Sequence, residues 1–344
     1  MTNRDPESVS PKIEPLTPAE KEALLARARA QGRALTEDEQ AAIFDPPSAA
    51  VQAPPAPEVA EMTPAPLNAG QLAELERDFF PELGPTERPP RLSLVGGVIF
   101  DFDDTLAYLA KPREALLEEG ARAADAFMRS RGMELPADFW RNIVEARRFA
   151  EEKSEEEREE HIADDAMSFL LQFFGYPASK LDPAILQQAV DVFYAPEMTA
   201  WRLYPRAREV LAELRAARFK LAIIANYNCD RVFQRTVDFL GLRSYLDICL
   251  SSASVEYRKP DAAIFDIVRN QWDLLPYELV IVGDSLRHDI AGAVDLGALA
   301  IQTAFGADPQ VAFDNRQAAD SVSANAVVTS LAEVPALIKE WAAP

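Results

Sequence analysis

The chain has little of what marks secreted, membrane or metal-finger proteins. Among 344 residues there are two cysteines and two histidines. Two cysteines cannot form a disulfide framework, and they are not spaced as metal ligands. No apolar run approaches the roughly 20 residues that a membrane-spanning helix needs, and the first ten residues lack the apolar core of a signal sequence. We therefore expect a cytoplasmic protein with no membrane partner.

Positive charge is also scarce. The sequence has 35 lysines and arginines against 56 aspartates and glutamates, a formal net charge of −21. Such a surface repels nucleic acid, whose binding depends on cations that contact phosphates, and it repels anionic lipid headgroups. We expect no nucleic-acid partner. The composition is otherwise ordinary for a globular chain with a sizeable core, at 48% hydrophobic and 26% charged residues.

Proline divides the chain into two unequal parts. Fifteen of the 26 prolines lie within residues 1–90, and residues 45–66 have almost no bulky apolar side chain. Such a segment cannot offset the entropy lost on ordering. Capping signals such as Thr17-Pro-Ala-Glu20 predict short helices within this segment. We expect residues 1–90 to be a proline-rich, acidic and largely disordered lead, and the alternative is a docking segment for a protein partner.

From about residue 92 the sequence alternates between two patterns. Short continuous apolar runs are typical of strands buried on both faces, and they cover residues 94–100, 221–225, 246–250, 279–282, 299–303 and 326–329. Helix-like segments follow at residues 207–217, 231–240, 262–272, 289–296 and 331–341. This alternation predicts an α/β fold of three layers, with a parallel sheet between two layers of helices.

Residues 107–203 do not alternate in this way. Their apolar residues recur with helical period over 113–131, 137–149 and 161–174. We therefore expect an all-helical insertion after the first strand. It contains an acidic run, Glu151–Glu160, whose simplest interpretation is a solvated helix face or loop.

Carboxylates follow two of the expected strands. Asp101 and Asp103 come after the first, and Asp284 and Asp289 after the run at residues 279–282. Ligands of open α/β sheets bind beyond the carboxyl ends of the strands, so these acids should converge there. Crowded, partly buried carboxylates repel one another, and a divalent cation is the simplest neutraliser. A set of oxygen ligands favours Mg²⁺ over zinc.

Four motifs in a fixed order resemble the haloacid dehalogenase (HAD) superfamily. They are the strand ending in Asp101-Phe-Asp-Asp-Thr105, the strand ending in Asn226, the pair Lys259-Pro260, and the segment Gly283–Asp289, which reads GDSxxxD. The resemblance covers about residues 92–340. It implies a Rossmann-like core made of residues 91–106 and 204–344. It also implies that residues 107–203 form the cap of such proteins, with the lead at residues 1–90 outside the family pattern.

The resemblance also implies roles for the acids. Asp101 would be the nucleophile that forms an aspartyl-phosphate. Asp103 would protonate the leaving oxygen and then activate water. Mg²⁺ would be held by Asp101, by the backbone carbonyl of Asp103 and by Asp284. An aspartate at position 103 supplies the proton carrier that phosphate esters need, and dehalogenases of this superfamily lack it, so we do not expect dehalogenation.

The remaining motif residues would support this chemistry. By the same resemblance, Lys259 would neutralise the nucleophile and bind the phosphoryl oxygens, and Asp289 would orient Lys259 or a metal-bound water. Thr105 would stabilise its loop. The family usually has Ser or Thr where this chain has Ala225, and losing that donor costs about 2–4 kcal/mol if nothing replaces it. Asn226, through its amide or backbone N–H, is the expected substitute as a phosphate ligand.

We therefore expect a Mg²⁺-dependent phosphatase, a hydrolase of phosphoric monoesters that acts on a small phosphorylated metabolite. A phosphomutase with the same intermediate is one alternative. A non-catalytic HAD-fold binding or regulatory protein is another, favoured by Ala225 and by the long lead. The joint presence of Asp101, Asp103, Lys259 and Asp284 argues against it, because binding alone requires neither a nucleophile nor a proton carrier.

Overall fold

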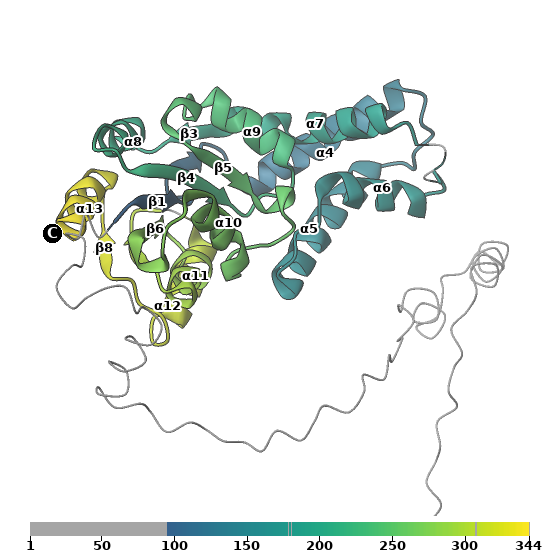
Figure 1. The fold of residues 1–344 in the computed structure, drawn as a ribbon. Coiled ribbons are helices and arrows are strands. Elements are labelled where there is room, and N and C mark those ends of the chain that lie inside the picture. Colours follow the sequence, from purple (N-terminus) through teal and green to yellow (C-terminus); the bar gives the residue numbers. More distant parts are fainter. Residues whose placement is uncertain (1–94, 178, 180, 307, 344) are drawn as a thin grey trace, which may run out of the picture. The chain divides into compact units, whose positions relative to one another are not determined.

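The computed structural model describes residues 95–177, 179, 181–306 and 308–343, and the expectations for the lead at residues 1–90 lie outside this range. Six strands form one sheet in the order β5-β4-β1-β6-β7-β8, and all neighbouring strands pair in parallel (Figure 1). Their bounds are β1 Gly97–Phe100, β4 Lys220–Ala225, β5 Ile248–Ser251, β6 Leu279–Gly283, β7 Leu299–Thr303 and β8 Ala326–Val328. The predicted parallel sheet is confirmed.

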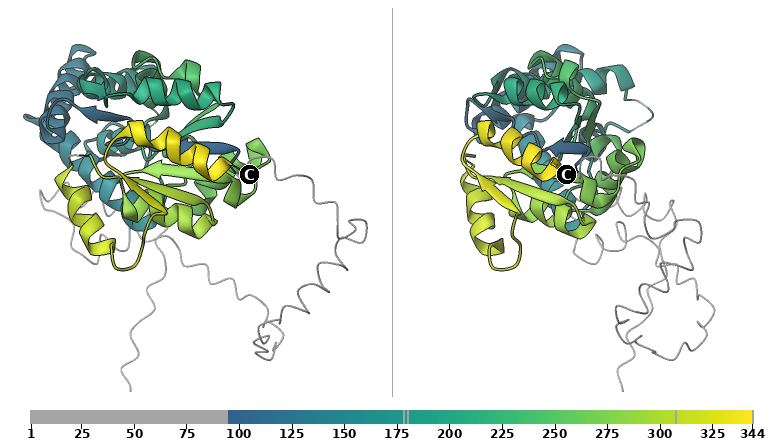
Figure 2. Two further views of the ribbon diagram at one scale, coloured as in Figure 1. Left: turned by 90° about the vertical axis from the view of Figure 1, so that its left-hand side faces the viewer. Right: turned by 60° about the vertical axis from the view of Figure 1, so that its left-hand side comes forward.

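Helices cover both faces of this sheet because its strands are apolar on both sides. On one face, Val98 and Phe100 belong to an apolar core shared with α8 (Ala207–Ala216), α9 (Asp230–Phe239) and α13 (Val334–Ala342). On the other face, Ile99 packs with residues of α10 (Ala262–Trp272) and α11 (Ala291–Leu296). Figure 2 shows α13, in yellow, lying across the strands. The three-layer, Rossmann-like α/β fold is confirmed.

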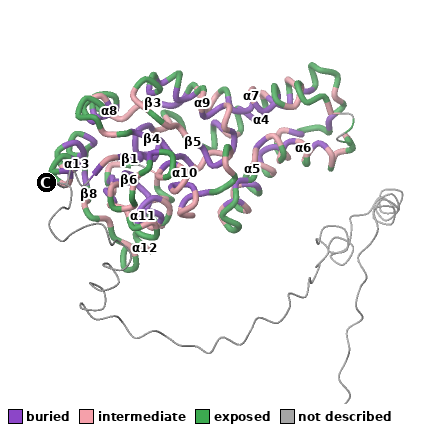
Figure 3. The backbone as a smooth tube through the Cα atoms, in the orientation of Figure 1, coloured by how far each residue is buried: buried purple, intermediate pink, exposed green. Residues whose placement is uncertain are grey.

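Four α-helices of the described residues lie between residues 110 and 200, and we call them the helical insertion. They are α4 Arg113–Ser130, α5 Phe139–Glu157, α6 Ala163–Phe173 and α7 Pro183–Ala200. Their apolar core extends to Cys229 and Val232 at the start of α9. The purple stretches of Figure 3 mark buried residues both in this insertion and along the sheet.

The expectation that residues 107–203 are helical throughout is wrong at both ends. Two short strands, β2 (Ala107–Leu109) and β3 (Trp201–Leu203), pair there antiparallel. The chain leaves and re-enters the core at adjacent positions, so extended pairing satisfies backbone groups that a helix end would leave open. Other elements that the sequence analysis did not foresee are α12 (Pro309–Ala318) and a π-helical turn at Leu286–Ile290, which precedes α11.

The acidic run is not simply solvated, contrary to our interpretation. It continues α5 to Glu157, and Glu160 beyond it is buried. Glu160 accepts hydrogen bonds from Arg258 at 2.6 Å and from the hydroxyl of Ser252 at 2.5 Å. Arg258 also donates to Glu151 at 2.8 Å. The buried guanidinium compensates for desolvation of these carboxylates, which is why a charged run lies against the core.

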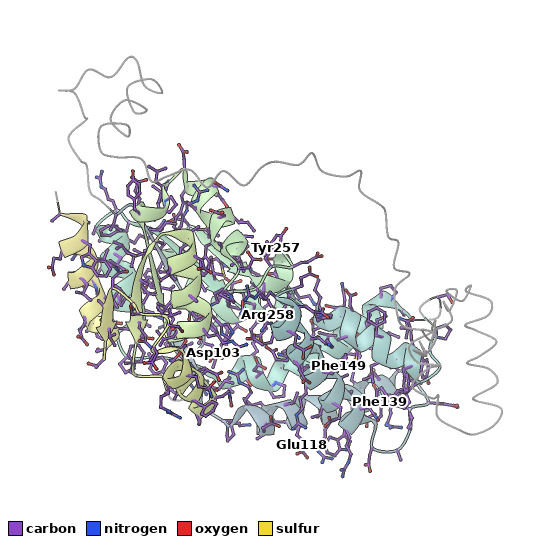
Figure 4. The ribbon with its side chains drawn as sticks, turned by 90° about the horizontal axis from the view of Figure 1, so that it is seen from below. Asp103, Glu118, Phe139, Phe149, Tyr257 and Arg258 are labelled. Carbon is purple, nitrogen blue, oxygen red and sulfur yellow. The ribbon has the colours of Figure 1, made fainter. Side chains whose placement is uncertain are left out.

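Backbone hydrogen bonds reinforce this attachment. The N–H of Glu160 donates to the carbonyl of Glu256 at 2.7 Å, and the N–H of Arg258 donates to the carbonyl of Arg158 at 3.3 Å. Figure 4 labels Arg258 where the helices of the insertion meet the core. The helical insertion is therefore bound to the core through the segment after α5 as well as through β2 and β3. Within the described part of the chain, no helix is long and apolar enough to cross a membrane.

Candidate active site

The first acid of the site lies at the end of the central strand. Asp101 directly follows β1, and its N–H donates to the carbonyl of Val282 on β6 at 2.8 Å. The Nζ of Lys259 lies 2.5 Å from Oδ1 of Asp101 and 2.7 Å from Oδ1 of Asp289. All three side chains are buried. The structure thus brings together three of the predicted site residues from three separate segments.

Burial and like charge dominate the electrostatics of this group. Burial raises the pKa of Asp101 to about 7, although Lys259 partly opposes the shift. Burial and the nearby charges of Asp101 and Asp289 raise the pKa of Asp284 well above its ordinary value. Burial alone would lower the pKa of Lys259, but Asp101 and Asp289 outweigh it, raise that pKa and keep the ammonium charged. The site therefore has more carboxylate than one lysine neutralises.

Three of these carboxylates could hold a metal ion. Asp101, Asp284 and Asp289 each place an oxygen within 4.8 Å of the others. An all-oxygen set of this kind fits Mg²⁺, and the raised pKa values of Asp101 and Asp284 show that the set lacks positive charge. The residues present therefore fit the ion. The metal ligands expected from the sequence included the backbone carbonyl of Asp103 and did not include Asp289.

Asp289 is close to the backbone at the end of β6. A Cβ built on Gly283 would lie 2.3 Å from Cγ of Asp289, so only glycine allows this approach. Oδ2 of Asp289 accepts a hydrogen bond from the N–H of Ser285 at 3.1 Å. These contacts fix Asp289 so that its other oxygen reaches Lys259. The placement agrees with the expected orienting contact, and the functional role stays a prediction.

Asp103 lies near the solvent-accessible side of the site. Its side chain is 41% exposed and forms an ion pair with Arg113, the first residue of α4. The surrounding pocket walls raise the pKa of Asp103 above its ordinary value, and Arg113 partly opposes this. An arginine of the helical insertion therefore orients the expected proton carrier.

The side chain of Asn226 holds the backbone of Lys259. Its Nδ2 donates to the carbonyl of Lys259 at 3.0 Å, and its Oδ1 accepts from the N–H of Lys259 at 2.9 Å. The amide that we expected to bind phosphate is thus engaged with the lysine segment. Ala225 ends β4 beside it and lines the same pocket.

The loop after Asp101 is held by its neighbours. Thr105 is fully buried, and its hydroxyl has no hydrogen-bond partner among the described residues. The N–H groups of Leu106 and Ala107 instead donate to the carbonyl of Phe102 at 3.0 and 2.9 Å. Asp104 accepts hydrogen bonds from the hydroxyl of Tyr204 at 2.6 Å and from the N–H of Asp308 at 3.0 Å. Backbone hydrogen bonds and the Asp104 side chain therefore stabilise this loop. We had expected the Thr105 hydroxyl to do so.

A pocket of about 440 Å³ lies between the carboxyl ends of the strands and the helical insertion. Its lining includes the predicted site residues Asp101, Asp103, Asn226, Lys259, Asp284 and Asp289. The insertion contributes residues that carry no recognisable sequence motif, among them Arg113, Arg147, Tyr194 and Glu197. The core contributes Tyr227, one residue beyond Asn226.

Comparison with known proteins decides the family. Residues 95–297, more than half of the chain, match the family model described as haloacid dehalogenase-like hydrolase. The chain belongs to the haloacid dehalogenase-like hydrolase family. The expectation of a HAD-type hydrolase is confirmed.

Several curated relatives of this haloacid dehalogenase-like hydrolase are named as phosphatases. The chain is 24% identical over 209 residues to the glyceraldehyde 3-phosphate phosphatase of Methanocaldococcus jannaschii, covering 61% of this chain and 85% of that protein. It is 31% identical over 130 residues to the ribulose-1,5-bisphosphate 5-phosphatase of Halopiger xanaduensis, covering 38% and 52%. It is 29% identical over 128 residues to the phosphoserine phosphatase of Thermus thermophilus, covering 37% and 51%.

A solved structure supports the fold. The 2-haloacid dehalogenase from Pseudomonas syringae pv. Tomato superposes with a TM-score of 0.52 at 23% identity, covering 72% of this chain and 100% of that chain. At this identity the likeness concerns the fold alone.

Several pocket residues were missed by the sequence analysis. Glu197 and Tyr227 lie in ordinary helical and loop contexts, and the hydroxyl of Tyr227 donates to Glu197 at 2.7 Å. Arg113 was noted only as the start of a helix. The signal that could have found them is their position next to motifs: Tyr227 directly follows Asn226, and Arg113 begins the first helix after the Asp101 loop.

Proposed function

We propose that the protein is a Mg²⁺-dependent phosphatase that hydrolyses a small phosphorylated metabolite through a phosphorylated Asp101. The observation that carries this proposal is the buried contact between Lys259 and Asp101 at 2.5 Å, beside Asp284 and Asp289. A buried lysine that favours the ionised form of a carboxylate lining a pocket is an arrangement that supports nucleophilic attack on a phosphoryl group.

In the first step Oδ of Asp101 attacks phosphorus. The bond between phosphorus and the leaving oxygen breaks, and the electron pair goes to that oxygen. Asp103, in its carboxylic acid form, transfers its proton to the leaving oxygen. The raised pKa of Asp103 favours this form, and Arg113 holds the side chain in place. The leaving alcohol departs with that proton, and Asp101 is phosphorylated.

In the second step water attacks phosphorus, and Asp103, now a carboxylate, accepts its proton. The bond between phosphorus and Oδ of Asp101 breaks, which regenerates the Asp101 carboxylate and releases inorganic phosphate. Lys259 lies beside Asp101 throughout and offsets the negative charge of the transferred group. Asn226 supports this step as a positioning residue, because its amide fixes the backbone of Lys259.

The carboxylates of Asp101 and Asp284, with the backbone carbonyl of Asp103, would hold Mg²⁺, and Asp289 lies close enough to assist. The ion would neutralise carboxylate and phosphoryl charge when bound. Asp284 is buried without a cationic partner among the described residues, and this supports a bound cation at the site.

The helical insertion would act as the cap that closes the pocket from above. Arg113, Arg147 and Glu197 reach the pocket from this insertion, so the leaving group of the substrate would lie among them. A pocket of about 440 Å³ suits a metabolite rather than a polymer. The phosphatases related to this chain, which by name act on small monoesters, support the same substrate class.

Release of phosphate from p-nitrophenyl phosphate tests this proposal, with Mg²⁺ and with EDTA. The wild-type protein should release phosphate only with Mg²⁺. Asp101→Asn should lose at least about a hundredfold in kcat/KM, whereas Glu340→Gln, an exposed residue of α13, should behave as wild type. Equal activity of Asp101→Asn and wild type would contradict the assignment of the nucleophile. No activity from folded protein would contradict the proposed function.

A further inference from the structure

The pocket is strongly acidic even where it faces the leaving group. Its lining includes eleven acidic and five basic side chains. The acidic ones are Asp101, Asp103, Asp104, Glu114, Glu151, Glu155, Glu197, Asp284, Asp289, Asp308 and Asp314. A single Mg²⁺ would leave this excess of negative charge only partly compensated. The pocket therefore disfavours a substrate that brings further negative charge beyond its phosphate.

Every arginine among the described pocket-lining residues already has a carboxylate partner. The pairs are Arg113 with Asp103, Arg147 with Glu151 at 2.6 Å, Arg148 with Glu114 at 2.6 Å, and Arg258 with Glu160 at 2.6 Å. A second anionic group on a substrate would have to displace one of these carboxylates. Breaking the buried pair of Arg258 and Glu160 would leave that carboxylate without its cation and offset the new contact, whereas the exposed pair of Arg148 and Glu114 would cost little to break.

Glu197 is one of the acids that line this pocket from the helical insertion. It lies near the end of α7, and the hydroxyl of Tyr227 donates to its Oε1 at 2.7 Å. Burial, then the charge of Glu197, raises the pKa of Tyr227 well above its ordinary value, so Tyr227 remains a donor. Among the described residues, Tyr227 is the one hydrogen-bond donor to Glu197, and no lysine or arginine lies within ion-pair distance of it.

Glu197 lines the pocket that Asp101, Asp103 and Lys259 also line. Asp103, and then Glu197, raise the pKa of Arg113. The charge of Glu197 also acts on Arg147, after Tyr194 and Glu151. Glu197 thus lines the same pocket as the expected proton carrier, Asp103, and as two arginines whose pKa its charge helps to raise. A leaving group attached to a phosphoryl group at Asp101 would occupy the pocket that this carboxylate lines.

We propose that Glu197, fixed by Tyr227, selects monophosphates whose leaving group is neutral or cationic and carries a hydrogen-bond donor, and rejects those with a second anionic group. The inference rests on the proposed phosphatase function and names the substrate class of that site. A hydroxyl or ammonium group can donate to the second oxygen of Glu197. A carboxylate or second phosphate would meet a like charge, and like-charge contacts are an effective means of specificity.

Three monoesters of similar size test this directly: 2-aminoethyl phosphate, 2-hydroxyethyl phosphate and phosphoglycolate. Each has a two-carbon leaving group, which carries an ammonium or a hydroxyl on the second carbon or has a carboxylate as that carbon. We expect kcat/KM for phosphoglycolate to be at least about tenfold below that for the other two. Hydrolysis of p-nitrophenyl phosphate, measured in parallel, reports whether the phosphatase function holds.

Glu197→Gln is the matched variant, because its amide oxygen still accepts the hydrogen bond of Tyr227. It should reduce the ratio of kcat/KM for 2-aminoethyl phosphate over phosphoglycolate about tenfold. Glu340→Gln removes the same charge from an exposed site on α13 and should leave the ratio unchanged.

The possible outcomes distinguish a failure of the role proposed for Glu197 from a failure of the proposed phosphatase function. Equal kcat/KM for the three esters, or a preference for phosphoglycolate, would overturn the role of Glu197 while p-nitrophenyl phosphate hydrolysis left the proposed function intact. A ratio that Glu197→Gln and Glu340→Gln change alike would also overturn it, because general charge would then explain the selectivity. Failure to hydrolyse p-nitrophenyl phosphate would overturn the proposed function and this inference with it.

Discussion

Lys259 and Asp101 are in direct contact although 158 positions separate them in the sequence, and the distance from Nζ to Oδ1 is 2.5 Å. Both side chains are buried at the carboxyl end of the sheet. An unpaired carboxylate in this position would be protonated or would destabilise the fold. The lysine therefore serves the stability of the core and keeps Asp101 available for nucleophilic attack.

Replacing Lys259 by methionine tests its part in the reaction. Removal of one aimed cation should reduce kcat for p-nitrophenyl phosphate by about 10²-fold or more. Lys339→Met removes a charge from the exposed pair with Glu213 and should change the free energy of unfolding by at most about 1 kcal/mol. Wild-type kcat in Lys259→Met, measured on folded protein, would exclude the lysine from the reaction.

Asp284→Asn should affect metal binding and stability in opposite directions. Without metal, the variant should be more resistant to urea than wild type, because burial and like charge disfavour the ionised form of Asp284. With metal, the increase in Tm that Mg²⁺ gives the wild type should be reduced or lost. An Asp284→Asn protein with an undiminished Mg²⁺-dependent increase in Tm would show that this carboxylate does not bind the ion.

Arg258 should be essential for the attachment of the helical insertion. Arg258→Met leaves Glu160 buried without its cation, and the free energy of unfolding should fall by about 3–5 kcal/mol. Urea titration measures this. The double variant Arg258→Met/Glu160→Gln should recover most of the loss, because no charge then remains unpaired. If the double variant were as unstable as the single one, packing rather than charge would explain the effect.

The stability of Arg258→Met should also depend on pH. Burial raises the pKa of Glu160 even with Arg258 present, and loss of the cation raises it further. The folded state then binds a proton more tightly than the unfolded state, so stability falls as pH rises from the ordinary pKa of glutamate toward the folded-state value. The deficit relative to wild type should be smaller at pH 5 than at pH 8. A deficit independent of pH would contradict this explanation.

Ala225→Ser should restore a donor at the end of β4. Ala225 is buried and lines the pocket beside Asn226, whose amide is occupied by Lys259. A hydroxyl at position 225 should therefore increase kcat several-fold, as part of the roughly 2–4 kcal/mol that one aimed donor can supply. Steady-state kinetics, with a thermal melt to confirm the fold, measures this. Unchanged kcat would mean that another donor already contacts the phosphoryl group.

Residues at the ends of apolar strands could be predicted well from the sequence. The runs before Asp101 and Asp284 are apolar on both faces, which fixes them as inner strands whose carboxyl ends meet. The bounds differed by a few residues, as at β1, because pairing rather than composition decides where a strand begins. The proximity of Asp101, Lys259, Asp284 and Asp289 followed from strand order and the family resemblance.

Long-range pairs of ordinary charged residues could not be predicted. Glu160 lies in a run that looks solvated, and only the three-dimensional position of Arg258, 98 positions away, makes it buried. Glu197 and Tyr227 likewise meet only through the packing of α7 against the loop after β4. No periodic pattern or characteristic spacing in the sequence marks such pairs. The sequence placed Asn226 near the site correctly. It could not show that the amide binds the backbone of Lys259, because that contact depends on the path of a loop.

If Asp101 carries the phosphoryl group during the reaction, the phosphorylated protein can be trapped and the modified residue identified. Asp103→Asn should slow hydrolysis of the intermediate, because no carboxylate accepts the proton of water. Acid-quenched Asp103→Asn protein, mixed with p-nitrophenyl phosphate and Mg²⁺, should yield a peptide phosphorylated at Asp101 by mass spectrometry. An unmodified Asp101 in protein that has released p-nitrophenol, or phosphate on another residue, would contradict the account.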